Sequence, residues 1–390
     1  MLLINTAYKN IVRSGRRTLL NVSVLSLVLV IMLAYNGLLD GWFDESRREM
    51  RKWETAEGQY WHPEYQYGDM FSLQDAHGLP PAVLDAEVAV GHATAILAVQ
   101  ASIYPQGRMQ NICLRGIDPQ QSVIELPSRK LQEDNGDAIH AIIGVRMARA
   151  ARLQEGDRVM MRWRDKDGAF DAREIIIDHI FTSRRSALDQ MQVWISLQSL
   201  REITGLEGEA SYVVSAGKSQ PLPAEDWVFR SPAYLMADLD SMMLAARIEG
   251  ALVSIILLIL ALLTIFDTQT LSIFRRQREI GTYVALGMRP KAVMWLFTLE
   301  GTMYSVLAIF MTAVCGSPLL WLLAYLGIPL PASLGHVGLV GNARLIPYYK
   351  PSSVLVILAV VVLMSALISF LPTRKIARQD MLQALKGKIT

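Results

Sequence analysis

The residue types that most often do chemistry in proteins are present, but their spacing fits no catalytic or metal site. No His-Glu-x-x-His string occurs, and no histidine pairs with Cys113 or Cys315. Ala216-Gly217-Lys218-Ser219 resembles the end of a phosphate-binding loop, but Tyr212 occupies the position of that loop's first glycine. We therefore predict no catalytic residue, no metal ligand and no nucleotide site on this chain. The scattered histidines considered are His62, His77, His92, His140 and His179.

Two carboxylates stand inside long apolar runs, where an ionised side chain is costly unless it is paired or close to the interface. Asp267 lies eight residues before a cluster of arginines that starts at Arg275. It could be a gating or proton-linked contact, but an interhelical hydrogen bond or a salt bridge to Arg275 or a neighbour is favoured. Glu300 is predicted to be structural and to pair with an arginine of the same connection.

The composition points to a membrane protein. Of 390 residues, 52% are hydrophobic and 19% are charged, and the mean hydropathy is +0.27, which exceeds the needs of one soluble core. The net charge of +2 and the position of the basic residues beside apolar runs exclude nucleic acid as a partner. Cys113 and Cys315 lie in different kinds of segment and are poor candidates for a mutual disulfide.

Four apolar runs are long enough to cross a bilayer as helices, at residues 18–39, 250–274, 292–326 and 352–371. A secretory signal is the alternative for the first, but its apolar run is longer than usual and lacks small residues at a cleavage site. Lys and Arg concentrate in the N-terminal segment, the second-to-third connection and the tail, so both termini are predicted to be cytoplasmic.

The remaining segments follow from this topology. Residues 1–17 are expected to form an amphipathic helix on the inner leaflet, with a frayed tail as the alternative. The others are 40–249, an external stalk and domain; 275–291, a cytoplasmic connection; 327–351, an external loop; and 372–390, a cytoplasmic tail.

The external segment alternates between strand and helix patterns, which predicts a mixed α/β domain on helical stalks. Strands are expected at 159–163 and 174–180, and a helix from about Pro80 to Gly91. At the outer end of the first span, Gly37 and Gly41 form a small-xxx-small pair that could pack against a second subunit.

Several strings then point to a family. The connection reads Arg-Arg-Gln-Arg-Glu-Ile-Gly-Thr-Tyr-Val-Ala-Leu-Gly-Met-Arg-Pro over 275–290, and the tail has Pro372-Thr373-Arg374-Lys375-Ile376-Ala377-Arg378. These resemble the FtsX-like or MacB-like ABC permease superfamily, and strings at 58–65, 114–119, 143–144 and 154–159 resemble its MacB-type periplasmic core domain. With four spans and no fused ATPase, the chain looks closest to the lipoprotein-releasing permeases of the LolC/LolE type.

The resemblance implies a permease subunit in a bacterial inner membrane that works with a cytoplasmic ABC ATPase dimer, which binds ATP and Mg, so that no cofactor is expected on this chain. A second permease subunit, identical or paralogous, membrane lipids, and a periplasmic carrier or outer-membrane component are the other implied partners. The expected function is export or release of lipoprotein, lipid or similar cargo. The alternative is an FtsX-like mechanotransmission subunit that regulates a periplasmic enzyme. Asparagine is common in the family at the position of Asp267.

The contact with the ATPase is expected on a short amphipathic helix in the cytoplasmic connection, with Ile280, Val284 and Leu286 toward the partner and glycines that allow close approach. A helix resting on the membrane surface is the alternative. The predicted coupling residues are Glu279, Ile280, Gly281, Ala285, Leu286, Gly287 and Arg289.

Overall fold

The computed structural model describes residues 15–131, 138–183, 191–217, 226–329 and 344–374, without the side chains of residues 16 and 17. The chain divides into two compact units. We call Met1–Phe43, Met243–Ile328 and Arg344–Thr390 the membrane unit, and Asp44–Met242 with Pro329–Ala343 the α/β unit. The predicted amphipathic helix at 1–17 lies outside the described residues except for Gly15–Arg17, which belong to the first described helix.

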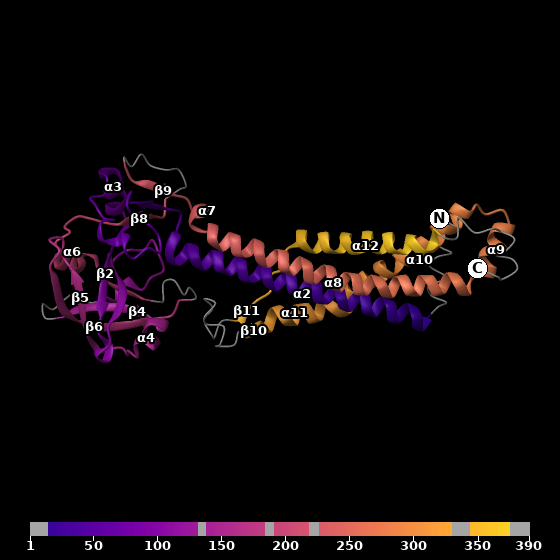
Figure 1. Cartoon of the computed structure of the whole chain (residues 1–390), viewed down its shortest axis with the longest axis horizontal. Helices are drawn as coiled ribbons and strands as arrows, with labels where there is room; N and C mark the ends of the chain where they lie inside the picture. The colour runs from indigo at the N-terminus through magenta and orange to yellow at the C-terminus, as the bar shows by residue number, and fades with distance from the viewer. Residues whose placement is uncertain (1–14, 132–137, 184–190, 218–225, 330–343, 375–390) are drawn as a thin grey trace. The chain divides into compact units, whose positions relative to one another are not determined.

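The elements are shown in Figure 1. The helices are α2 (Gly15–Met50), α3 (Ala82–Val90), α4 (Val145–Ala151), α6 (Leu197–Thr204), α7 (Pro232–Leu235), α8 (Ala237–Arg275), α9 (Gln277–Ala285), α10 (Pro290–Met311), α11 (Ser317–Leu326) and α12 (Pro351–Thr373). The strands are β1 (Gln59–Trp61), β2 (Ala93–Ile103), β3 (Gln110–Ile117), β4 (Ile139–Gly144), β5 (Arg158–Arg164), β6 (Phe170–Phe181), β7 (Gln192–Ser196), β8 (Tyr212–Ser215), β9 (Val228–Arg230), β10 (Ile328–Pro329) and β11 (Arg344–Leu345).

The α/β unit is built on one sheet of nine strands in the order β3-β7-β4-β6-β5-β2-β8-β1-β9. Because β2 pairs with β3 as well as with β5, six of these strands close on themselves, while β8, β1 and β9 extend from β2 as an open flap. Closure removes the free edges that six open strands would otherwise expose. The predicted mixed α/β fold is confirmed, but the closed sheet was not anticipated.

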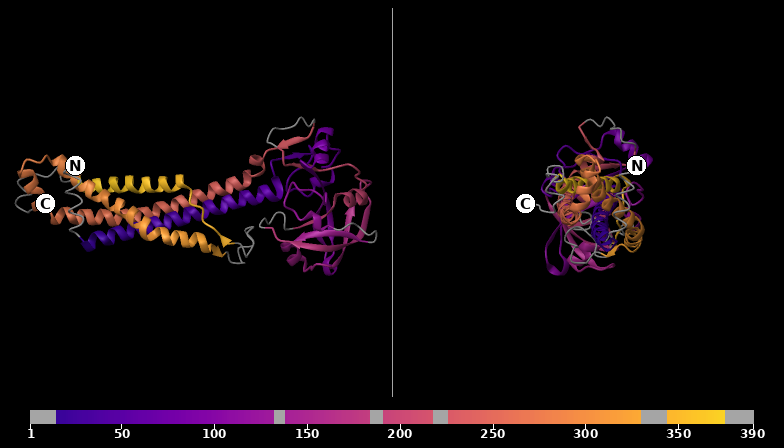
Figure 2. Two further views of the ribbon diagram at one scale, coloured as in Figure 1. Left: turned by 180° about the vertical axis from the view of Figure 1, so that it is seen from behind. Right: turned by 90° about the vertical axis from the view of Figure 1, so that its right-hand side faces the viewer.

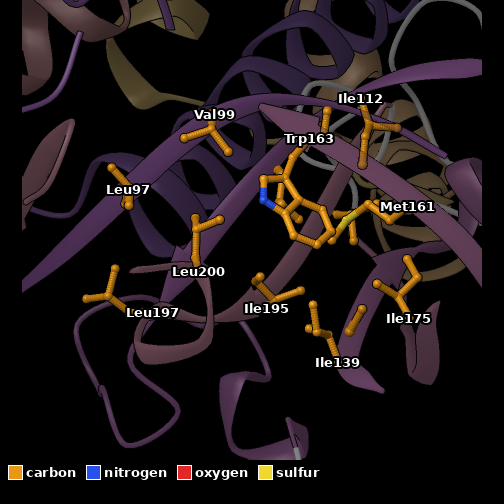
Figure 3. Close-up of a cluster of buried hydrophobic side chains, with 14 of the residues drawn as sticks. Leu97, Val99, Ile112, Ile139, Met161, Trp163, Ile175, Ile195, Leu197 and Leu200 are labelled. Atoms are coloured by element: carbon orange, nitrogen blue, oxygen red, sulfur yellow. The ribbon is translucent and has the colours of Figure 1, made fainter. Parts of the chain in front are cut away.

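The main core of this unit collects apolar side chains from all six closed strands and from α6 (Figure 3). Trp163 lies among Ile112, Met161 and Ile195 in this cluster and is 1% exposed. Its indole N–H donates to the carbonyl of Ile203 at 2.9 Å, so the ring is buried without an unpaired donor. A second cluster, rich in aromatic residues, covers the opposite side of β2, β3, β7 and β8.

The described residues contain four helical segments that are long and apolar enough to cross a bilayer, which confirms the four-span prediction; the first two extend beyond the membrane unit into the α/β unit. They are Thr18–Thr55, Ala237–Arg275, Pro290–Leu326 and Pro351–Thr373. In the third, α10 continues into α11 through a π-helical turn at Thr312–Gly316. Met236 (φ −97°, ψ 5°) separates α7 from α8, so the helix that contains the second span begins at Ala237.

Hydroxyl and amide side chains form hydrogen bonds between these helices. In a membrane, apolar packing alone stabilises helix contacts only slightly, because lipid tails are as apolar as the side chains. Thr268 of α8 donates to Asn21 of α2 at 3.2 Å, and Thr298 of α10 lies 3.0 Å from Thr373 of α12. Gly301 lets α10 and α12 approach closely, because a Cβ there would collide with the side chain of Ser369. Figure 2 shows these two helices side by side.

Candidate coupling site

The connection between α8 and α10 folds into a short helix with defined ends. The helical path breaks at Arg276 (φ −103°, ψ 19°), and α9 begins at the next residue. At the other end, Gly287 has φ +90°, its N–H donates to the carbonyl of Val284, and the N–H of Met288 donates to that of Tyr283. This pattern of bonds closes a helix and favours glycine. Pro290 then starts α10, where its fixed φ suits a first helical turn.

A small apolar cluster holds α9 against the bundle. Ile280 is 5% exposed and packs with Ile273 of α8 and with Val293 and Phe297 of α10. Tyr283, Val284 and Met288 pack around the same cluster. These contacts pack α9 against α8 and α10 within the membrane unit.

Arg276 links three elements at this point. Its guanidinium donates to Glu279 of α9 at 2.7 Å and to Glu300 of α10 at 3.1 Å, and it lies 5.0 Å from the ring centroid of Phe297. Burial lowers the pKa of Arg276, but hydrogen bonding to Glu279 and the charge of Glu300 outweigh burial and raise its pKa above the usual value. The predicted pairing of Glu300 with an arginine of this connection is confirmed, and the Glu300 side chain is 4% exposed.

The apolar side chains of the connection point in two directions, which corrects the prediction that Ile280, Val284 and Leu286 share one binding face. Ile280 and Gly281 are buried within the chain, whereas Leu286 is 81% exposed. The periodicity contained this signal, because six residues turn a helix by about 240°. We call the exposed residues of the connection the coupling surface; they are Arg278, Glu279, Thr282, Ala285, Leu286, Gly287 and Arg289.

Asp267 does not form the contact that was favoured for it. Its side chain is exposed on α8, and no residue that the structure describes donates a hydrogen bond to it or forms an ion pair with it. The prediction that Asp267 forms a salt bridge with Arg275 or a neighbour is therefore wrong within the described residues. The carboxyl group points away from the bundle.

The two glycines of the first span are covered by their own chain. A Cβ on Gly37 would lie 2.5 Å from the ring of Tyr349, and one on Gly41 would collide with the carbonyl of Ile346. Tyr348 donates its N–H to the carbonyl of Gly37 at 2.8 Å. These contacts account for the small-xxx-small spacing without a second subunit, so the interpretation as a dimer contact is not needed.

A charged site that the sequence interpretation missed lies beside these glycines. Asp40 of α2 is 7% exposed and accepts hydrogen bonds from Arg247 of α8 at 2.9 Å and from Ser353 of α12 at 3.3 Å. The ammonium group of Lys350 lies 3.9 Å away. The sequence signal for this site is an acidic residue directly after the apolar run 18–39.

Metal ligands do not gather in the part of the chain that the structure describes: no group of three or more His, Cys, Asp or Glu side chains there could hold an ion. Cys113 is buried in the α/β unit, Cys315 is exposed in the membrane unit, and both are free thiols.

Comparison with known proteins gives a match over the helical part of the chain. Residues 251–381 match the family model described as the FtsX-like permease C-terminal domain. The crystal structure of the periplasmic region of MacB from Actinobacillus actinomycetemcomitans is similar over 47% of this chain and 92% of that one, with 9% identity and a TM-score of 0.31. No curated protein matches the sequence. The match at 251–381 covers 131 of the 390 residues, and it makes this part of the chain similar to an FtsX-like permease C-terminal domain.

Proposed function

We propose that this chain converts ATP hydrolysis by a separate cytoplasmic ATPase dimer into movement of its α/β unit, which lies in the periplasm. The cargo is a lipoprotein, a lipid or a similar amphipathic molecule that is exported or released from the inner membrane. In this proposal both termini are cytoplasmic, and the coupling surface faces the ATPase. ATP and Mg are bound by the ATPase, and a second permease subunit and a periplasmic carrier or outer-membrane component complete the machine.

The observation that carries the proposal is the exposed Leu286 at the end of the anchored helix α9. Leu286 is 81% exposed at the turn that closes α9, so its apolar side chain is available to a partner protein. The helix behind it is held by the apolar cluster around Ile280 and by Arg276 with its two carboxylate partners. A force applied at Leu286 would therefore reach α8 and α10 through contacts already made.

Replacing Leu286 by Asp tests the proposal directly. A carboxylate in an otherwise apolar contact costs a few kcal/mol, so ATPase affinity should fall about a hundredfold or more. Because Leu286 is exposed, the permease itself should fold and insert normally. The measurement is the amount of ATPase that co-purifies with the variant, together with the stimulated ATP turnover.

Two matched variants control this experiment. Leu286→Met keeps an apolar side chain and should retain the ATPase, and Phe71→Asp introduces the same charge at an 84% exposed apolar position of the α/β unit. Normal recovery of ATPase with the Leu286→Asp protein would refute the coupling surface as the docking point. That result would favour the alternative in which α9 rests on the membrane surface.

A further inference from the structure

Two segments of the α/β unit that are far apart in the sequence are joined by the side chains of His77 and Glu209. The Nδ1 atom of His77 lies 2.5 Å from the carboxylate of Glu209, and its Nε2 atom lies 3.0 Å from the carbonyl oxygen of Gln74. A carbonyl oxygen and an ionised carboxylate only accept hydrogen bonds, so both contacts are hydrogen bonds only when both ring nitrogens carry a hydrogen. The pair therefore holds one proton more than a neutral imidazole beside a carboxylate.

The second histidine in this place, His62, does not take up that proton. Its Nδ1 atom accepts a hydrogen bond from the backbone N–H of Glu64 at 3.3 Å, so that nitrogen carries no hydrogen. Burial lowers the pKa of His62, and the charge of His77 lowers it further, against the weaker opposite effect of Glu64 and Glu209. His62 is therefore neutral, and the additional proton belongs to His77 and Glu209.

The nearest basic side chain, Arg201 of α6, does not compete for the carboxylate of Glu209. Its guanidinium donates to the backbone carbonyls of Gly208 and Glu209, at 2.9–3.1 Å. Burial lowers the pKa of Arg201, and the charges of Asp85 on α3 and of Glu209 raise it. Arg201 thus fixes the backbone on which Glu209 lies and leaves its carboxylate to His77.

The contact between His77 and Glu209 lies beside a short backbone pairing. Gly78 donates its N–H to the carbonyl of Ala210 at 3.1 Å, and Ala210 donates to the carbonyl of Gly78 at 2.9 Å. Leu73 is buried in the aromatic cluster of the α/β unit, whereas Phe71 is 84% exposed. How firmly residues 71–79 are held therefore determines how firmly the exposed Phe71 ring is presented.

We propose that His77 and Glu209 form a proton-dependent latch, which fixes residues 71–79 in acid and releases them as the pH rises. Without the additional proton, a neutral imidazole donates through one nitrogen only, and the other nitrogen turns a lone pair toward an oxygen acceptor. Because the latched state binds the proton, a high proton concentration favours it. Histidine side chains exchange this proton between about pH 5 and 8. The proposal concerns the α/β unit alone and does not depend on coupling to an ATPase.

Hydrogen exchange of the full-length protein in detergent, followed by mass spectrometry, tests the latch. The amides to follow are those of Gly78 and Ala210, because they pair across the two joined segments. Exchange is measured at about pH 5.5 and about pH 8.5 and corrected for the chemical exchange rate, which itself rises with pH. The side chains of the pair are 19% and 27% exposed. For a charged hydrogen bond at such a site, protection should fall about five- to thirtyfold at the higher pH. Equal protection at both pH values would overturn the proposal.

Three variants separate the proton from the contact itself. Glu209→Gln supplies an amide N–H that donates to the neutral Nδ1 of His77 while Nε2 still donates to Gln74, so both amides should stay protected at both pH values. His77→Gln binds no proton, so its protection should be low and independent of pH. His92→Gln is the matched control, because His92 pairs with Glu87 at 3.2 Å at an exposed site and should keep the wild-type response. A wild-type response in Glu209→Gln or His77→Gln, or its loss in His92→Gln, would overturn the latch.

Discussion

At the scale of single residues, Asp40 shows how one carboxylate can join three helices. It lies on α2, its partners lie on α8 and on the start of α12, and its side chain is 9% exposed. A buried carboxylate is stable only when cations and donors surround it. Asp40 therefore links α2 to α8 through Arg247 and to α12 through Ser353.

Replacing Asp40 by Asn should destabilise the membrane unit by about 1–3 kcal/mol, because Arg247 and Lys350 lose their shared anion while the amide keeps the size of the side chain. Thermal unfolding in detergent measures the effect. Asp44→Asn is the matched control, because Asp44 pairs with Arg48 at an exposed site of the same helix and should change stability by about 0.5 kcal/mol or less. Equal loss in the two variants would contradict the role given to Asp40.

At the scale of elements, the direction of α9 depends on the turn that follows it. Gly287 adopts φ +90°, where a side chain is strained, and this turn positions Leu286 at the exposed end. The cluster around Ile280 and the pair between Arg276 and Glu300 fix the other end of the helix. The turn at Gly287 and the contacts of Ile280 and Arg276 together determine which side chains the coupling surface presents.

Gly287→Ala should cost about 1–2 kcal/mol of local stability, because an L residue is disfavoured at positive φ. We expect faster trypsin cleavage after Lys291 and weaker ATPase binding, while the α/β unit is unchanged. Gly217→Ala is the control, since Gly217 has no positive φ and a Cβ there would meet only the Ser215 hydroxyl, at 3.4 Å. Unaltered cleavage in Gly287→Ala would show that the turn tolerates a side chain.

At the scale of the whole molecule, α2 and α8 each contribute to both compact units. Within the membrane unit they are joined by Asn21 with Thr268 and by Asp40 with Arg247, and within the α/β unit by Arg47 with Asp240. An antiparallel helix pair with contacts along its length suits transmission of force from the connection at α9 to the α/β unit.

The proposed function requires that α9 and the α/β unit lie on opposite sides of the membrane. In a chain with Cys113→Ala and Cys315→Ala, a cysteine at Thr282 should react with an impermeant reagent only from the cytoplasm, and one at Asp167 only from outside. Gly338→Cys, in the connection that the structure does not describe, should behave like Asp167→Cys. Permeabilised cells provide the control in which all three react. Labelling of Thr282→Cys in intact cells would reverse the orientation.

The sequence by itself determined the spans, the class of the outer domain and the pairing of Glu300. Apolar runs of sufficient length predict spans because the bilayer has a fixed thickness, and a buried carboxylate next to arginines predicts a pair because its charge must be compensated. The spans and the domain class follow from local patterns of polarity, and the pairing of Glu300 follows from the need to compensate its charge.

Only the tertiary structure decided which side of each helix meets which partner. It placed Ile280 inward and Leu286 outward, covered Gly37 and Gly41 with Tyr349 and Ile346, and left Asp267 exposed. It also closed six strands through the pairing of β2 with both β3 and β5. The physical reason is that these contacts join residues distant in the chain, and they depend on how whole surfaces fit together, which no local pattern of polarity specifies.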